Sequence, residues 1–82
     1  MIGVGIITCD RPDMFNVCFE SLNDEWYDEL VVVDDGINDG PLRRRGADYI
    51  RTSGREGVGK AKNKAFKHLL DKGCDYIILV ED

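Results

Sequence analysis

The stretch Leu30-Val31-Val32-Val33-Asp34-Asp35-Gly36 is the most informative part of this sequence about its fold. Four consecutive apolar residues, three of them β-branched valines, are typical of a strand that is covered on both of its faces. The aspartates and the glycine that follow are poorly suited to the interior of a sheet. The sequence therefore predicts a buried strand over Leu30–Val33 that delivers two carboxylates to one edge of a sheet.

Three further runs predict the other strands. Ile2–Thr8 is almost continuously apolar, and Tyr76–Val80 has the same character, so both are expected to be buried strands. Ala47–Thr52 is shorter and more polar, which favours a position near the edge of the sheet. In chain order the four predicted strands are therefore Ile2–Thr8 (strand 1), Leu30–Val33 (strand 2), Ala47–Thr52 (strand 3) and Tyr76–Val80 (strand 4).

Two helices separate the strands. The first is expected over about residues 12–22, with Pro12 in its first turn and Asp10 as its cap. The second is expected over Lys60–Lys72 and is ended by Gly73. Apolar residues recur at helical spacing in both segments: Phe15, Cys18, Phe19 and Leu22 in the first, and Ala61, Ala65 and Leu69 in the second.

The alternation of short apolar strands with helices predicts an α/β fold. We expect a three-layer αβα sandwich, a Rossmann-like half domain with a mostly parallel four-stranded sheet in the order 3-2-1-4. Residues 37–46 and the glycine-rich residues 53–59 are expected to form loops. A chain of 82 residues provides one domain, so residues 1–82 are treated as a single domain.

Composition restricts the class of protein. With 43% apolar and 33% charged residues, the chain is typical of soluble globular domains. No apolar run reaches the roughly 20 residues of a membrane span, and the N-terminus has the pattern of a strand, not of a secretory signal. The three cysteines, Cys9, Cys18 and Cys74, show no disulfide or zinc-site spacing, which favours a cytoplasmic location.

The charge is unevenly distributed along the chain. The net charge of −5 argues against a general nucleic-acid binder. Residues 43–72 nevertheless hold ten of the eleven Lys and Arg residues and only three acids. This basic segment predicts a local anion site, with a solvated helix face that pairs with acidic segments as the alternative.

Polar clusters follow three of the predicted strands, at Thr8–Arg11, at Asp34–Gly36 and at Glu81-Asp82. In a parallel sheet the carboxyl ends of the strands meet at one edge, where ligands bind. The basic segment Arg55–Asn63 approaches the same edge and opens a helix, whose N-terminus favours phosphate. Carboxylates accept hydrogen bonds from a base or a ribose and bind Mg²⁺ or Mn²⁺. The pattern therefore predicts a nucleotide with its metal; for any single carboxylate, a helix cap or a solvated turn is the alternative.

Four blocks of the chain resemble the N-terminal half of family 2 glycosyltransferases, which have the GT-A fold. The blocks are Ile6–Pro12, Val31–Gly36, Glu56–Asn63 and Tyr76–Asp82, in that order and over nearly the whole chain. Each block alone is a weak signal, and the four together are fairly specific. The resemblance implies a nucleotide-sugar donor, commonly a UDP-sugar, and a divalent cation, Mg²⁺ or Mn²⁺.

The resemblance also implies roles for individual residues. Thr8 and Arg11 would border the base and ribose, Asp35 would accept the uracil N–H, and Asp34 would support that turn. The segment Gly57–Asn63 matches the family's GxxxARN pattern, with Lys62 in place of its arginine and facing the base or the diphosphate. The implied nucleotide-sugar site comprises Thr8, Arg11, Asp34, Asp35, Gly57, Lys60, Lys62 and Asn63, and the implied metal ligands are Glu81 and Asp82 of a DxD-type motif.

The chain departs from the family pattern at its end. The family's metal-binding acid falls just after Asp82, and the acceptor half with the catalytic base lies further on. No catalytic residue is therefore assigned, and we expect little or no transferase activity from the 82-residue chain alone.

Two alternatives remain open. Gly54–Lys60 satisfies the G-x-x-x-x-G-K pattern of a phosphate-binding P-loop. Against it, Ala61 replaces the hydroxyl residue that binds Mg²⁺, and the strand before the loop is polar. The other alternative is a non-catalytic folding or dimerisation unit, in which Tyr76–Val80 is an exposed apolar edge that pairs with a second copy.

Overall fold

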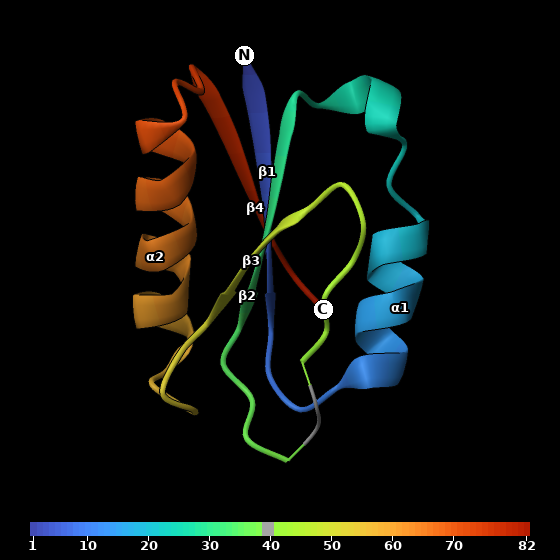
Figure 1. The fold of residues 1–82 in the computed structure, drawn as a ribbon, viewed down its shortest axis with the longest axis vertical. Coiled ribbons are helices and arrows are strands. Elements are labelled where there is room, and N and C mark those ends of the chain that lie inside the picture. The colour runs from blue at the N-terminus through green and yellow to red at the C-terminus, as the bar shows by residue number, and fades with distance from the viewer. Residues whose placement is uncertain (39–40) are drawn as a thin grey trace.

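A four-stranded sheet lies between two helices in the computed structural model, which describes residues 1–38 and 41–82 (Figure 1). The strands are β1 (Ile2–Thr8), β2 (Glu29–Asp34), β3 (Asp48–Arg51) and β4 (Tyr76–Glu81). All neighbouring strands pair in parallel, in the order β3-β2-β1-β4. The predicted fold class and strand order are confirmed.

The two helices, α1 (Pro12–Glu20) and α2 (Val58–Asp71), cover opposite faces of the sheet, and a short 3₁₀ helix, η1 (Asp24–Trp26), precedes β2. Successive residues of β2 alternate between the two layers, as the two-residue period of a strand requires. Val31 and Val33 pack with the buried face of α2, whereas Val32 packs with Phe15 of α1. Residues of β2 thus belong to the apolar cores on both faces of the sheet, which explains why its sequence is continuously apolar.

Two glycines of β1 let α2 lie close to the sheet. A Cβ atom placed on Gly5 would be 3.0 Å from the Cβ of Ala65 and 3.0 Å from a methyl of Leu79. A Cβ on Gly3 would be 2.7 Å from the sulfur of Cys74. Glycine within a strand is therefore explained here by the close approach of neighbouring elements.

Strand β4 is an edge strand, and it is less buried than its apolar sequence predicted. Ile77 and Leu79 pack against the core on the α2 side. Tyr76 and Ile78 point to the other face, where they are 72% and 53% exposed, because the α1 layer leaves them uncovered. The prediction of an exposed edge is confirmed, and the prediction of a fully buried strand is wrong.

The bounds of several elements differ from those predicted. Helix α1 ends at Glu20, where the Ser21 N–H closes the last turn on Val17 O. Helix α2 begins at Val58, two residues earlier than predicted, after Gly57 at φ 108°. Gly73, at φ 93°, ends α2 as predicted. Residues 39–40 of the predicted loop 37–46 lie outside the described residues. No helix in the described ranges is long and apolar enough to cross a membrane.

Candidate functional site

The three polar clusters predicted at strand ends lie at one edge of the sheet, in the lower half of Figure 1. Thr8 is the register partner of Asp34, and Ile7 is the partner of Glu81. The Asp35 N–H continues the pairing by donating to the Thr8 carbonyl at 2.8 Å. The start of α2 lies at the same edge, because Asp35 binds the loop that leads into it.

Asp35 connects the end of β2 to the start of α2. Asp35 is buried, with only 3% of its surface exposed. Its carboxylate accepts hydrogen bonds from the backbone N–H groups of Glu56 at 2.8 Å and Gly57 at 2.9 Å, and from the Thr52 hydroxyl. Burial alone raises the pKa of Asp35, but these three hydrogen bonds outweigh it, and the pKa lies below its ordinary value. Asp35 is therefore a charged group at neutral pH that fixes the glycine-rich loop.

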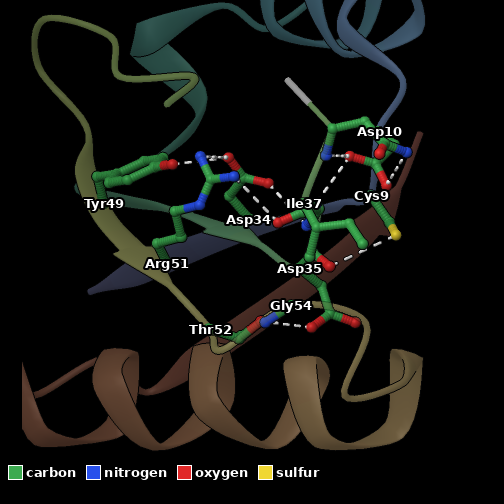
Figure 2. A network of polar contacts seen from close by, with 11 residues as sticks. Cys9, Asp10, Asp34, Asp35, Ile37, Tyr49, Arg51, Thr52 and Gly54 are labelled. Atoms are coloured by element: carbon green, nitrogen blue, oxygen red, sulfur yellow. Dashed lines mark hydrogen bonds and ion pairs between the residues drawn. The ribbon is translucent and has the colours of Figure 1, made fainter. Parts of the chain in front are cut away.

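Asp34 performs a different task from its neighbour, because adjacent strand residues point to opposite faces. Figure 2 shows Asp34 directed toward Tyr49 and Arg51, and Asp35 directed away from them toward Thr52. The Tyr49 hydroxyl donates to Asp34 Oδ2 at 2.6 Å, and Arg51 lies 3.5 Å from the same oxygen. Asp34 is thus tied to β3, and its implied role in a nucleotide site stays a prediction.

Thr8 and Arg11 both contact Asp82. The Thr8 hydroxyl, which is fully buried, donates to Asp82 Oδ2 at 2.5 Å, and Arg11 Nη1 donates to the Asp82 carbonyl at 3.0 Å. The structure therefore brings the ends of β1 and β4 together, as the sequence predicted, and joins them by direct side-chain contacts.

The predicted site residues of α2 lie in two kinds of surroundings. Lys62 forms an ion pair with Glu81 across the edge of the sheet. Lys60 and Asn63 are exposed on the first two turns of the helix. Lys62 is therefore directed toward β4 in this structure, and its implied contact with a base or diphosphate stays a prediction.

The implied metal ligands, Glu81 and Asp82, both have partners within the chain. Glu81 is paired with Lys62, and one Asp82 oxygen accepts the Thr8 hydroxyl. Within residues 1–38 and 41–82, no group of three or more His, Cys, Asp or Glu residues is placed to hold a metal ion. Two carboxylates already engaged by the chain are an incomplete ligand set for Mg²⁺ or Mn²⁺.

Two adjoining cavities open at this edge, with volumes of 290 Å³ and 120 Å³. Ile7, Cys9 and Val58 belong to the walls of both. The larger cavity is also lined by Asp35, Arg55 and Gly57, and the smaller by Thr8, Arg11, Glu81 and Asp82. A third cavity, of 710 Å³, lies near the amino end of β2 and has none of these strand-end groups in its walls.

The shared wall is apolar in character. Burial raises the pKa of the Cys9 thiol, and the carboxylate of Asp10 raises it further. The thiol is therefore uncharged at neutral pH and acts as a small hydrophobic group. An apolar floor with charged groups on its rim suits a ligand that has a flat apolar part and a polar or ionic part.

Asp10 was predicted to cap α1, and this prediction is wrong. The N-cap residue is Arg11, and no side chain caps the helix. Asp10 instead turns away from α1, with its backbone at φ 53°, and accepts the N–H groups of Ile37 and Asn38, each at 2.8 Å. It also forms an ion pair with Arg55 at 2.9 Å. Asp10 therefore joins the loops that follow β1 and β2 to the loop before α2.

The glycine-rich loop does not have the donor arrangement of a P-loop. In a P-loop, backbone N–H groups are directed at phosphate. Here the backbone N–H groups of residues 53–57 donate hydrogen bonds to acceptors within the chain itself. The donors and acceptors are Ser53 N–H to Glu56, Gly54 N–H to Thr52, Arg55 N–H to the Asp35 carbonyl, and the Glu56 and Gly57 N–H groups to the Asp35 carboxylate. These contacts count against the P-loop alternative.

In comparisons with known proteins, no family model matches this chain, and no curated protein or solved structure matches it. The resemblance to family 2 glycosyltransferases therefore rests on the four sequence blocks.

Proposed function

We propose that the carboxyl edge of the sheet binds the nucleoside diphosphate part of a nucleotide-sugar, with a UDP-sugar as the favoured donor. The chain would then supply donor binding for glycosyl transfer, in which the bond between the sugar and the diphosphate is replaced. The observation that carries the proposal is the pair of adjoining cavities at this edge. Their walls combine strand-end polar groups with the start of a helix, the usual place for a nucleotide in an open parallel sheet.

The edge offers donors to both parts of the ligand. The first N–H groups of α2 have no partner within the helix, and Lys60 is exposed beside them, which favours the diphosphate there. Thr8 and Arg11 line the smaller cavity, where a ribose or a base edge finds hydroxyl and guanidinium donors.

Asp35 keeps capacity for a base. A carboxylate has about four acceptor positions, and the chain's own donors to Asp35 are the Thr52 hydroxyl and the N–H groups of Glu56 and Gly57. One position is left for a uracil N–H at the wall of the larger cavity. Because the Asp35 carboxylate is charged and shielded from water, an added N–H donor would form a strong hydrogen bond with it.

Isothermal titration of the 82-residue chain with UDP and with ATP, each with Mg²⁺, tests the proposal. UDP is expected to bind at least about tenfold more tightly than ATP, a difference of about 1.4 kcal/mol. The variant Arg11→Ala should weaken UDP binding, whereas Lys67→Ala, an exposed control on the middle of α2, should not. Equal affinity for both nucleotides, or insensitivity to Arg11→Ala, would overturn the proposal.

A further inference from the structure

Arg55 is a cation in the wall of the 290 Å³ cavity that the sequence resemblance does not use. Its side chain is 56% exposed, and its guanidinium contacts Asp10, whose side chain is 11% exposed. The pair lies between the loop after β1 and the loop before α2, next to the proposed nucleotide site.

Asp10 stays satisfied without Arg55. Its Oδ1 accepts the N–H groups of Ile37 and Asn38, and the Asn38 side chain donates to Oδ2 at 3.2 Å. A carboxylate held by these three donors is not left as an unpaired charge when one further partner departs. Moving the Arg55 side chain therefore costs little at the Asp10 end.

The contact uses the guanidinium incompletely. Arg55 Nε at 3.1 Å and Nη2 at 2.9 Å both donate to the same oxygen, Oδ2 of Asp10. The strongest arginine contacts are two parallel hydrogen bonds to two different oxygens, which a phosphate group offers. A phosphate in the adjacent cavity would provide better geometry than Asp10 does, and it carries more charge.

We propose that Arg55 exchanges partners when the site fills: its guanidinium leaves Asp10 and forms a two-point contact with a phosphate group in the 290 Å³ cavity. Asp10 holds the side chain in place before the ligand arrives. The exchange makes the site selective for phosphorylated ligands over free nucleosides. If the phosphate belongs to a nucleoside diphosphate, this inference rests on the proposed function. Free pyrophosphate offers the same phosphate oxygens to the guanidinium.

The backbone at this position provides a clean variant. Arg55 has φ 47°, in the left-handed region that glycine adopts without strain. Arg55→Gly therefore keeps the loop conformation while it removes the guanidinium. Arg45→Gly removes one exposed arginine from a different loop, outside the cavity wall, and is the matched control.

The test measures binding of UDP, uridine and pyrophosphate to the unchanged chain and to both variants, together with the Nε–H NMR resonance of Arg55. UDP and pyrophosphate should shift that resonance, and uridine should not. Arg55→Gly should weaken UDP binding about tenfold or more and leave uridine binding unchanged, and Arg45→Gly should change neither. Arg55→Lys, which keeps the charge without the planar fork, should give an intermediate loss and serves if the glycine variant does not fold.

The outcomes separate this inference from the proposed function. If UDP binds equally well to Arg55→Gly, the exchange is overturned while nucleotide binding stands. If pyrophosphate shifts the Arg55 resonance but UDP binds no better than pyrophosphate, the exchange stands and the nucleotide proposal fails. If no phosphorylated ligand shifts the resonance, the exchange is overturned.

Discussion

The carboxylate of Asp35 accepts the backbone N–H of Gly57 at 2.9 Å, so the end of β2 holds the start of α2. The Glu56 N–H donates to the same carboxylate at 2.8 Å. Because Asp35 is only 3% exposed, water competes weakly for these hydrogen bonds. A single side chain therefore sets the distance between the strand and the helix whose ends line the larger cavity.

Asp35→Asn should destabilise the fold. The amide provides one acceptor oxygen and places an NH₂ group against N–H donors, which leaves buried groups unpaired. We expect a loss of about 1–3 kcal/mol in the free energy of unfolding, measured by urea denaturation. Asp71→Asn, the same change at an exposed position on α2, should alter stability by less than about 0.5 kcal/mol. Equal effects of the two substitutions would contradict the account of Asp35.

Stability should fall in acid. The hydrogen bond from the Asn38 N–H lowers the pKa of Asp10, and the contact with His68 lowers the pKa of Asp48. The pKa of Asp35 is lowered as well. These carboxyls bind protons more weakly in the folded state than in the unfolded state, so their contribution is present above the ordinary pKa of 3.8 and is lost as pH falls through the lower folded-state values.

Urea midpoints measured over a range of pH test that prediction. The midpoint should be steady above about pH 5 and should drop below about pH 4. Asp48→Asn should make the drop shallower, because it removes one of the shifted groups. A midpoint that rises on acidification would show that the sign is wrong.

Gly5→Val should be strongly destabilising. The first added carbon alone would lie 3.0 Å from atoms of Ala65 and Leu79, and the methyl groups would push α2 away from the sheet. Overpacking of this kind costs about 1–3 kcal/mol. Gly59→Ala is the control, because a Cβ there meets nothing within 4 Å, and alanine favours a helix. Thermal unfolding should show a lower midpoint for the first variant and an equal or higher one for the second.

Self-association through β4 remains a prediction, and the exposed positions on that strand make it testable. Ile78 is 53% exposed on β4, which is an edge strand of the sheet formed by the described residues. We expect sedimentation experiments to show dimers that increase with protein concentration, and Ile78→Lys to reduce them. Lys67→Ala should leave the dimers unchanged. A chain that stays monomeric at every concentration would contradict this prediction.

The fold could be predicted from the sequence because local pattern and global arrangement agree. The valine run of β2 requires cover on both faces, and the helices supply it at Phe15 and at Ala61, Ala65 and Leu69. The degree to which β4 is exposed could not be predicted, because it depends on how far the α1 layer extends across the sheet. An apolar run alone carries no information about that extent.

The site could be predicted only in part. Strand ends and a parallel sheet place Thr8, Asp35 and Asp82 at one edge without any coordinates. The contact between Asp10 and Arg55 was not predicted, although both lie in segments predicted at this edge, because it depends on a left-handed backbone at both positions and arginine gives no signal for that conformation. The pairing of Lys62 with Glu81 was not predicted for these two residues, but it agrees with the alternative in which the basic segment pairs with acidic segments.

Amide shift mapping by ¹⁵N NMR during a UDP titration with Mg²⁺ shows whether a uridine nucleotide binds at the carboxyl edge of the sheet. Shifts are expected to concentrate at residues around the two cavities, including Thr8, Arg11, Asp35 and Gly57. The same titration with ATP serves as the comparison. Shifts confined to Gly54–Lys60, stronger with ATP than with UDP, or a spectrum that UDP leaves unchanged, would contradict the claim that this edge of the sheet binds a uridine nucleotide.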